Sequence, residues 1–196
     1  MKKIILASQS PQRRKLLKQL GLNFKVIPSK IDETLENGGT ICERIEKLAL
    51  KKAQNIADFI DEEALIIGAD TVVVLDEILG KPPTKEDAIS MLKKLSGKTH
   101  QVITGISIID TLSKKQCSSS QITYVTMRPY SEQDIHRYIN SGEYQDKAGS
   151  YAIQGLGALL VEKIDGDYFN IVGLPISVLN YLLKKFDFDI FSLYDR

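Results

Sequence analysis

The hydrophobic and polar positions of this chain form alternating blocks that predict strands and helices in turn. Short runs rich in β-branched residues predict strands over residues 3–7, 23–27, 100–110 and 120–127, two more within 64–75, and another over 158–164. Capping residues followed by helical spacing predict helices over residues 11–20, 40–60, 84–95, 131–142 and 175–186. Helices and strands interleaved in this way indicate an α/β or α+β fold around a mixed sheet.

Residues 64–75 are the most informative segment, because every residue in it except Asp70 and Thr71 is apolar or small. An ionised carboxylate costs several kcal/mol to bury without a partner, so Asp70 is expected to reach water or to hold a cation. Gly68 and Ala69 suggest a bend that exposes this acid between two strands. Asp70 then either binds Mg²⁺ or activates water at the edge of a cleft, or caps a turn at a strand end.

Residues 8–14 read Ser-Gln-Ser-Pro-Gln-Arg-Arg and join a predicted strand to a predicted helix. Free backbone N–H groups and the helix dipole make such a junction attractive to anions. Ser8, Ser10, Arg13 and Arg14 add hydroxyl and guanidinium donors suited to phosphate. The alternative is an N-capping serine followed by a solvated basic turn, since no glycine-rich phosphate loop is present.

Lys52 falls on the apolar stripe of the helix predicted over 40–60, a stripe that also includes Leu48, Ile56 and Phe59. It either extends past the edge of the core or directs its ammonium group into a phosphate site. Lys81 lies in a loop that reads Gly-Lys-Pro-Pro, which is a weak signal alone.

The glycine-rich segment 146–157 allows close approach of the backbone to a ligand. Its Gln154 could present a bidentate amide to the edge of a nucleobase. His100 and His136 have no serine or cysteine arrangement typical of a hydrolase triad, and we interpret them as structural.

Composition limits the class of protein. The chain has 26 Lys and Arg against 25 Asp and Glu, a net charge of +1 that argues against nonspecific nucleic-acid binding. Cys42 and Cys117 lack metal-ligand spacing and are expected to be reduced thiols. The apolar stretch at the N-terminus is too short for a secretory signal, and no run approaches the roughly 20 residues of a membrane span. We expect a cytoplasmic protein without a membrane or nucleic-acid partner.

Several short motifs, weak singly but specific in this order, closely resemble those of the Maf family of nucleoside triphosphate pyrophosphatases. They are Leu6-Ala-Ser-Gln-Ser-Pro11 with Arg13, Leu48-Ala-Leu-Lys-Lys-Ala53, Gly68-Ala-Asp-Thr-Val72, Gly80-Lys-Pro82, Leu95-Ser-Gly97 with His100, Asp146-Lys-Ala-Gly149, Ile153-Gln-Gly155, Gly166-Asp-Tyr168 and Val172-Gly-Leu-Pro175. The resemblance implies a single domain over residues 1–196 with two lobes flanking a substrate cleft. It also implies an elongated fold around a curved mixed sheet, like that of inosine triphosphate pyrophosphatases, and a possible homodimer.

The resemblance further implies that a nucleoside triphosphate is hydrolysed to the monophosphate and pyrophosphate with a divalent metal, Mg²⁺ or Mn²⁺. Asp70 matches the family's catalytic acid and a metal ligand, and Glu33 matches an acidic position near the metal. Ser8, Arg13, Lys52 and Lys81 match positions lining the triphosphate site, where Lys52 and Lys81 are expected to assist catalysis and Ser10 to contact substrate.

Three positions distinguish branches of the family. Thr71 and Gln154 match the branch that acts on dTTP and UTP better than the branch associated with 7-methyl-GTP. Gln12 departs from the pattern, since arginine is usual there, and Arg14 would point about 100° away from that position around a helix. The resemblance therefore implies a pyrophosphatase acting on dTTP, UTP and modified pyrimidine nucleotides. The alternatives to this function are a nucleotide-binding regulator of septum formation and cell division, or a 7-methyl-GTP pyrophosphatase.

Overall fold

The computed structural model describes residues 2–195, which divide between two compact units. Of the described residues, the first unit comprises 2–70, 104–121 and 173–195, and the second comprises 71–103 and 122–172. The long strands β3 (Ala64–Val74), β5 (Thr99–Asp110) and β6 (Gln116–Met127) each contribute residues to both units. Each unit is described below by itself.

The first unit is built on strands in the order β2-β1-β3-β5-β6. Strand β1 (Lys3–Leu6) pairs in parallel with β2 (Phe24–Val26) on one side and with β3 on the other. In the second unit, β3 pairs antiparallel with β4 (Ile78–Leu79), and β6 pairs antiparallel with β7 (Val161–Asp165). Because parallel and antiparallel pairs both occur, the predicted mixed α/β fold class is confirmed.

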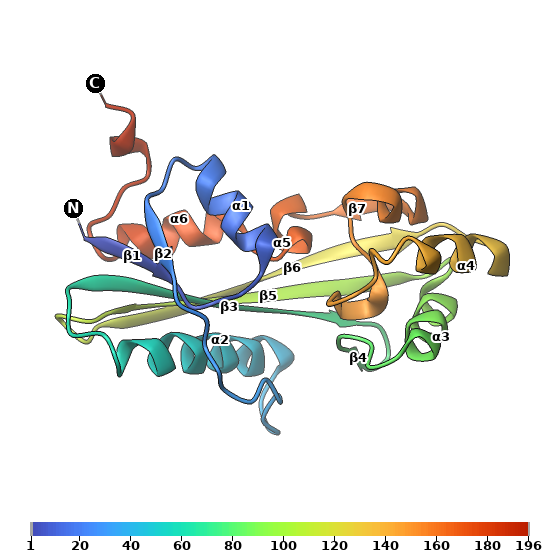
Figure 1. The fold of residues 1–196 in the computed structure, drawn as a ribbon, viewed down its shortest axis with the longest axis horizontal. Coiled ribbons are helices and arrows are strands. Elements are labelled where there is room, and N and C mark those ends of the chain that lie inside the picture. The colour runs from blue at the N-terminus through green and yellow to red at the C-terminus, as the bar shows by residue number, and fades with distance from the viewer. Residues whose placement is uncertain (1, 196) are drawn as a thin grey trace. The chain divides into compact units, whose positions relative to one another are not determined.

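Three helices cover the sheet of the first unit (Figure 1). Helix α2 (Ile41–Ala57) lies on one face, and α1 (Pro11–Gln19) and α6 (Ile176–Lys184) lie on the other. Helix α2 begins with the predicted capping box, in which Thr40 and Glu43 satisfy each other's backbone N–H groups. Burial of its Ala53 and Ile56 against Ile5 and Ile66 of the sheet fixes the helix in place.

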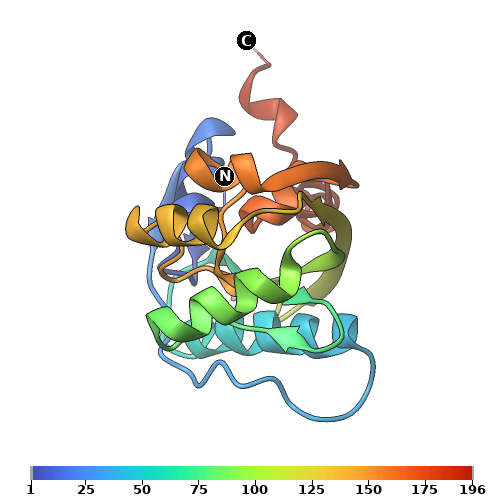
Figure 2. The same ribbon diagram turned by 90° about the vertical axis from the view of Figure 1, so that its right-hand side faces the viewer.

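The second unit has its own core, in which α3 (Lys85–Leu95) and α4 (Glu132–Asn140) lie side by side (Figure 2). Leu92 and Ile139 of these helices pack with Val102 and Val125 from the strands. Helix α5 (Tyr168–Val172) and short 3₁₀ turns over Ala148–Ser150, Gly155–Leu160 and Phe191–Leu193 complete the described chain.

The sequence interpretation of residues 64–75 as two strands with a bend is wrong, because β3 is continuous through Asp70. Gly68 serves close packing instead of a bend. A Cβ atom there would lie 2.1 Å from the carbonyl oxygen of Ala49, so only glycine lets α2 approach the strand this closely. Asp70 is nevertheless partly accessible to solvent, since Asp70 and Thr71 are half-buried while the neighbouring strand residues are buried.

Other differences concern element ends. Phe59 is 76% exposed, because α2 ends at Ala57 and the apolar stripe does not continue to it. The segment predicted as a strand over 158–164 begins as a 3₁₀ turn, and β7 starts only at Val161.

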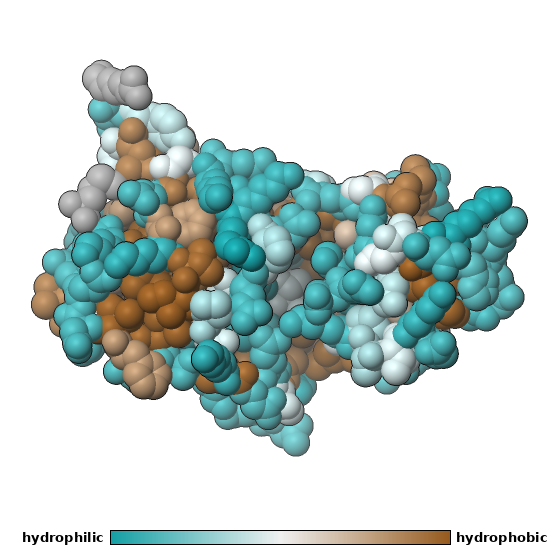
Figure 3. All heavy atoms as spheres, viewed as in Figure 1, coloured by the Kyte–Doolittle hydropathy of each residue, from teal (hydrophilic) through white to brown (hydrophobic). Residues whose placement is uncertain are grey.

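No helix of residues 2–195 is long and apolar enough to cross a membrane. Figure 3 shows an apolar area around β1 and β2, where β2 is the edge strand of the sheet.

Candidate functional site

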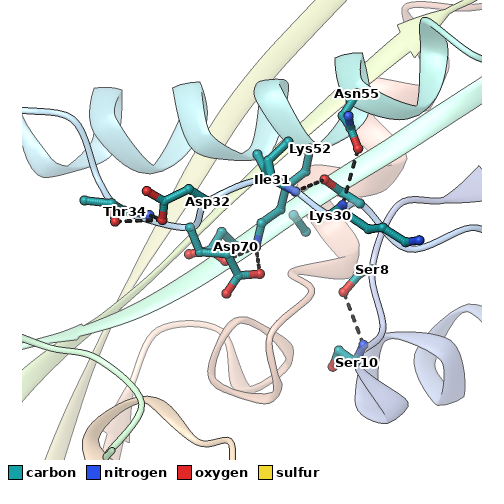
Figure 4. A network of polar contacts seen from close by, with 12 residues as sticks. Ser8, Ser10, Lys30, Ile31, Asp32, Thr34, Lys52, Asn55 and Asp70 are labelled. Carbon is teal, nitrogen blue, oxygen red and sulfur yellow. Dashed lines mark hydrogen bonds and ion pairs between the residues drawn. The ribbon is translucent and has the colours of Figure 1, made fainter.

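Asp70, Lys52 and Glu33 meet in the first unit, although each comes from a different element. Figure 4 shows the Lys52 ammonium directed toward Asp70. Asp70 comes from β3, Lys52 from α2, and Glu33 from the loop that follows β2. The Lys52 ammonium donates to Asp70 Oδ1 at 2.5 Å and lies 2.7 Å from Glu33 Oε1. One buried cation therefore joins two carboxylates.

Burial differs sharply among these three side chains. The Lys52 side chain is 6% exposed, against 14% for Asp70 and 49% for Glu33. A buried ammonium is retained only where opposite charge and hydrogen bonds compensate for lost water. Lys52 therefore does not extend past the core edge into solvent; its ammonium lies against the acid on β3.

Arg13 is buried as well, and its guanidinium group binds three acceptors of the first unit. Its Nε donates to the Gly173 carbonyl at 2.8 Å, and one terminal nitrogen donates to the Ala69 carbonyl at 2.8 Å and to Ser8 Oγ at 3.0 Å. Burial lowers the pKa of Arg13, while the negative charges of Asp70 and Glu33 oppose that shift. Arg13 thus holds the backbone immediately before Asp70 and adds positive charge beside the acid.

The start of α1 shows the N-capping serine that is one interpretation of residues 8–14, and the phosphate site stays a prediction. Ser10 is the N-cap and accepts the Arg13 backbone N–H at 3.4 Å, with Pro11 in the first turn. Ser8 Oγ accepts both the Arg13 guanidinium and the Ser10 N–H, the latter at 3.3 Å. Gln12 is half-buried in the first turn. Arg14 is exposed and donates to the Gln9 carbonyl at 2.9 Å, so it does not replace a guanidinium at position 12.

The loop that carries Glu33 is ordered by local hydrogen bonds (Figure 4). The Lys30 N–H donates to Asn55 Oδ1 of α2 at 3.3 Å, and the Thr34 N–H donates to Asp32 Oδ1 at 2.9 Å. Hydrogen bonds from Thr34 also lower the pKa of Asp32. Asn55 was not among the residues expected from the sequence. It lies three residues after Lys52, on the same side of the helix, which is the signal that could have identified it.

The donors in this cluster suit a hard divalent cation. Asp70 and Glu33 offer carboxylate oxygens, and Mg²⁺ is commonly bound by one or two carboxylates with waters and substrate phosphates. Within residues 2–195, no group of three or more His, Cys, Asp or Glu side chains forms a complete protein cage for a metal. Asp70 and Glu33 are the carboxylates of this cluster that could contribute oxygen ligands to such an ion.

The other three site residues expected from the sequence, Thr71, Lys81 and Gln154, belong to the second unit. Thr71 follows Asp70 directly on β3, Lys81 lies exposed after β4, and Gln154 precedes the 3₁₀ turn over Gly155–Leu160. The Gly149 N–H donates to the Gly80 carbonyl at 3.1 Å, which ties the Lys81 loop to the glycine-rich segment.

The two histidines differ in environment. His100 is 2% exposed and its Nε2 lies 2.7 Å from the Tyr151 hydroxyl, whereas His136 is exposed on α4. This agrees with a structural role for His100. Neither histidine is part of the cluster around Lys52.

A mixed α/β protein in which two carboxylates share a buried lysine, with a buried arginine nearby, has the charged groups that enzymes acting on phosphate use. The particular family follows from comparison with known proteins. The family model described as "Maf-like protein" matches residues 3–186. The chain belongs to the Maf family, and the prediction of this family is confirmed.

Two relatives are named "dTTP/UTP pyrophosphatase". One, from Thermoanaerobacter sp. (strain X514), is 49% identical over 96% of this chain and 98% of its own length. The other, from Acetivibrio thermocellus, is 48% identical over 95% of this chain and 96% of its own length.

Solved structures are similar at lower identity. The nucleoside-triphosphatase / dITP/XTP pyrophosphatase from Mycobacterium abscessus has a TM-score of 0.43 and 13% identity, covering 64% of this chain and 74% of its own. A HAM1 protein from Coxiella burnetii has a TM-score of 0.47 and 19% identity, covering 65% and 73%.

Proposed function

We propose that this protein is a nucleoside triphosphate pyrophosphatase that hydrolyses dTTP and UTP to the monophosphate and pyrophosphate. The observation that carries the proposal is the buried Lys52 ammonium held between Asp70 and Glu33. Carboxylates that bind metal or activate water, beside a cation that binds phosphate, are what hydrolysis of a phosphoanhydride requires. Relatives of nearly the same length carry the dTTP/UTP pyrophosphatase name.

Asp70 is the catalytic residue of this proposal. Its half-buried carboxylate lies on rigid β3, where it accepts the proton of the water that attacks the α-phosphorus. Lys52 holds the carboxylate in place and neutralises phosphate charge. Lys81 and Arg13 add positive charge for the leaving pyrophosphate, which favours the transition state over the ground state.

Asp70 and Glu33 are the residues that would hold Mg²⁺ or Mn²⁺. Such an ion neutralises phosphate oxygens and makes a bound water more acidic. Glu33 is the more exposed of the two acids. Of the two ion pairs with Lys52, the one with Glu33 would therefore be the easier to give up for a metal ion.

Specificity for the pyrimidine falls to residues outside the charged cluster. Thr71 and Gln154 are proposed to contact the base, and Ser8, Ser10 and Gln12 to contact the substrate from the start of α1. An amide such as that of Gln154 can pair with both a carbonyl and an N–H group, which a pyrimidine presents along one edge.

The test is a substrate panel with purified protein. The initial rates of nucleotide loss are measured for dTTP, UTP, CTP and 7-methyl-GTP, with Mg²⁺, with Mn²⁺ and with a chelator. We expect dTTP and UTP to have the highest kcat/KM, and the chelator to abolish turnover. Preference for 7-methyl-GTP would contradict the proposed substrate. Tight nucleotide binding without turnover would contradict an enzyme and favour a regulator.

We also propose a homodimer, which the family resemblance implies, and a cytoplasmic location. The open edge of β2 and the apolar area around it are compatible with self-association (Figure 3). Sedimentation equilibrium of the purified chain measures the mass directly, and a single species of about 22 kDa, the mass of one chain, would contradict the dimer.

A further inference from the structure

Residues on and just after α4 hold the segment that carries Gln154, and all of them belong to the second unit. The Glu143 carboxylate accepts the Leu156 N–H through Oε1 at 3.1 Å and the Gly157 N–H through Oε2 at 3.2 Å. Both donors lie at the start of the 3₁₀ turn over Gly155–Leu160, where backbone N–H groups have no partner within the turn. One side chain thus binds two successive amides of this loop.

The backbone at Gly155 is shaped around the same carboxylate. Gly155 has a φ of +71°, and a Cβ atom there would lie 2.5 Å from Glu143 Oε1. Any other residue would meet both an unfavourable backbone conformation and the carboxylate itself. Gln154 immediately precedes this glycine, so its Cα position depends on the contact that Glu143 makes with the next residues.

Further contacts fix the chain before Gln154. The Ala152 N–H donates to the Tyr138 hydroxyl at 3.1 Å, and the Tyr151 hydroxyl lies 2.7 Å from His100 Nε2. Burial raises the pKa of Tyr138 to about 12, and the charge of Glu143 adds to this rise. With these residues fixed on one side of Gln154, Glu143 is the side chain that fixes the other.

We infer that Glu143 is a positioning residue for pyrimidine selection, because its carboxylate holds the backbone from which Gln154 reaches the base. The inference rests on the proposed function and on the contact proposed there between Gln154 and the base. Glu143 does not touch the reacting atoms. Its loss should therefore weaken substrate binding and base discrimination and leave the chemical step largely intact.

The experiment compares Glu143→Ala and Glu143→Gln with the wild type. Glu162→Gln, a change at an exposed glutamate of β7, is the matched control. For Glu143→Ala we expect the KM for dTTP to rise about tenfold, as for loss of a hydrogen bond to a charged group, with kcat within about twofold. The ratio of kcat/KM for dTTP to kcat/KM for CTP should also fall in Glu143→Ala. Glu143→Gln keeps one acceptor oxygen and should lie between Glu143→Ala and the wild type, whereas Glu162→Gln should match the wild type.

Two further measurements separate positioning from a general loss of structure. In a Gln154→Ala background, Glu143→Ala should cause no further loss of base preference, because Glu143 acts on the base only through the Gln154 side-chain amide. Hydrogen exchange at the Leu156 and Gly157 amides should be faster in Glu143→Ala, while α3 keeps its protection. Additive losses in the double variant, or unchanged exchange at these amides, would overturn the inference.

Failure of the proposed function gives a different result. A wild-type protein inactive on every nucleotide of the panel would overturn the proposed activity and, with it, the selective role of Glu143. An active wild type whose KM and base preference survive Glu143→Ala would overturn the role of Glu143 alone.

Discussion

At the scale of single residues, the first unit places its charges so that each buried cation has protein acceptors. Lys52 joins Asp70 and Glu33, and Arg13 is bound by the carbonyls of Ala69 and Gly173. The sequence singles out Lys52 as a lysine on an apolar helical stripe, but it leaves open where the ammonium points and does not predict its ion pairs with Asp70 and Glu33. It does not predict the acceptors of Arg13, since these are backbone carbonyls 56 and 160 residues away.

Asp70→Asn tests the catalytic acid. The change keeps the size of the side chain and removes the negative charge that binds metal or accepts a proton. We expect kcat to fall by at least ~10²-fold, the low end for loss of a general base. Circular dichroism should be unchanged, and the exposed Asp76→Asn should retain full activity. Near-normal turnover would assign the catalytic role to another carboxylate, with Glu33 as the first choice.

Lys52→Met tests the buried cation against a matched neighbour. Methionine fills a similar volume but leaves the Asp70 and Glu33 carboxylates without their shared ammonium. We expect kcat/KM to fall by roughly 10- to 100-fold, as for loss of a hydrogen bond to a charged group. Lys51→Met removes an exposed lysine paired with Glu36 and should change kcat/KM by less than about twofold. Equal effects of the two substitutions would contradict a special role for Lys52.

Gln12→Arg tests position 12, where the resemblance to the family leads us to expect an arginine. A guanidinium group forms planar pairs with carbonyl or phosphate oxygens, whereas an amide offers one donor group and one acceptor. We expect kcat/KM for dTTP or UTP to rise roughly tenfold, with thermal stability nearly unchanged. Gln19→Arg at the far end of α1 is the control. Unchanged ratios among dTTP, UTP, CTP and 7-methyl-GTP would show that position 12 does not take part in selection.

At the scale of elements, the sequence predicts the long strands β5 and β6 and the capped helices, but it divides the continuous strand β3 into two. Thr40 and Thr84 cap helix starts through hydrogen bonds with residues three positions later, so the sequence of a short segment is enough to predict them. The Ala49 carbonyl of a distant helix packs against Gly68, so a glycine that the sequence suggests as a bend is instead a packing site within a continuous strand. The 3₁₀ turn over Gly155–Leu160 likewise depends on Glu143, outside the segment.

His100 gives the second unit a predicted response to acid. Burial lowers the pKa of this residue on β5 to about 4 from its ordinary 6.5, and the Tyr151 hydroxyl is its hydrogen-bond partner. The unfolded chain binds the proton more readily, so stability falls as the pH drops from 6.5 to 4, by about 3 kcal/mol from this group. Well above pH 6.5 neither state holds the proton, and the contribution is constant.

Chemical denaturation as a function of pH measures this response. The free energy of unfolding of His100→Asn should fall by about 3 kcal/mol less than that of the wild type between pH 6.5 and pH 4. His136→Gln removes the exposed histidine and should follow the wild type. Parallel curves for His100→Asn and the wild type would contradict a buried neutral histidine.

At the scale of the whole molecule, relatives of almost the same length and nearly half-identical sequence make the family assignment a property of the entire chain. Each unit has its own buried cluster. The charged cluster of Lys52, Asp70 and Glu33 lies in the first unit, whereas Lys81 and Gln154 lie in the second.

The identity of the products tests the central claim most directly. Purified protein is incubated with dTTP and a divalent metal, and the nucleotide and phosphate products are resolved by anion-exchange chromatography. Cations that hold the outer phosphates as a leaving group predict cleavage between the α- and β-phosphates, with dTMP and pyrophosphate released in equal amounts. Release of dTDP and orthophosphate instead would contradict a pyrophosphatase.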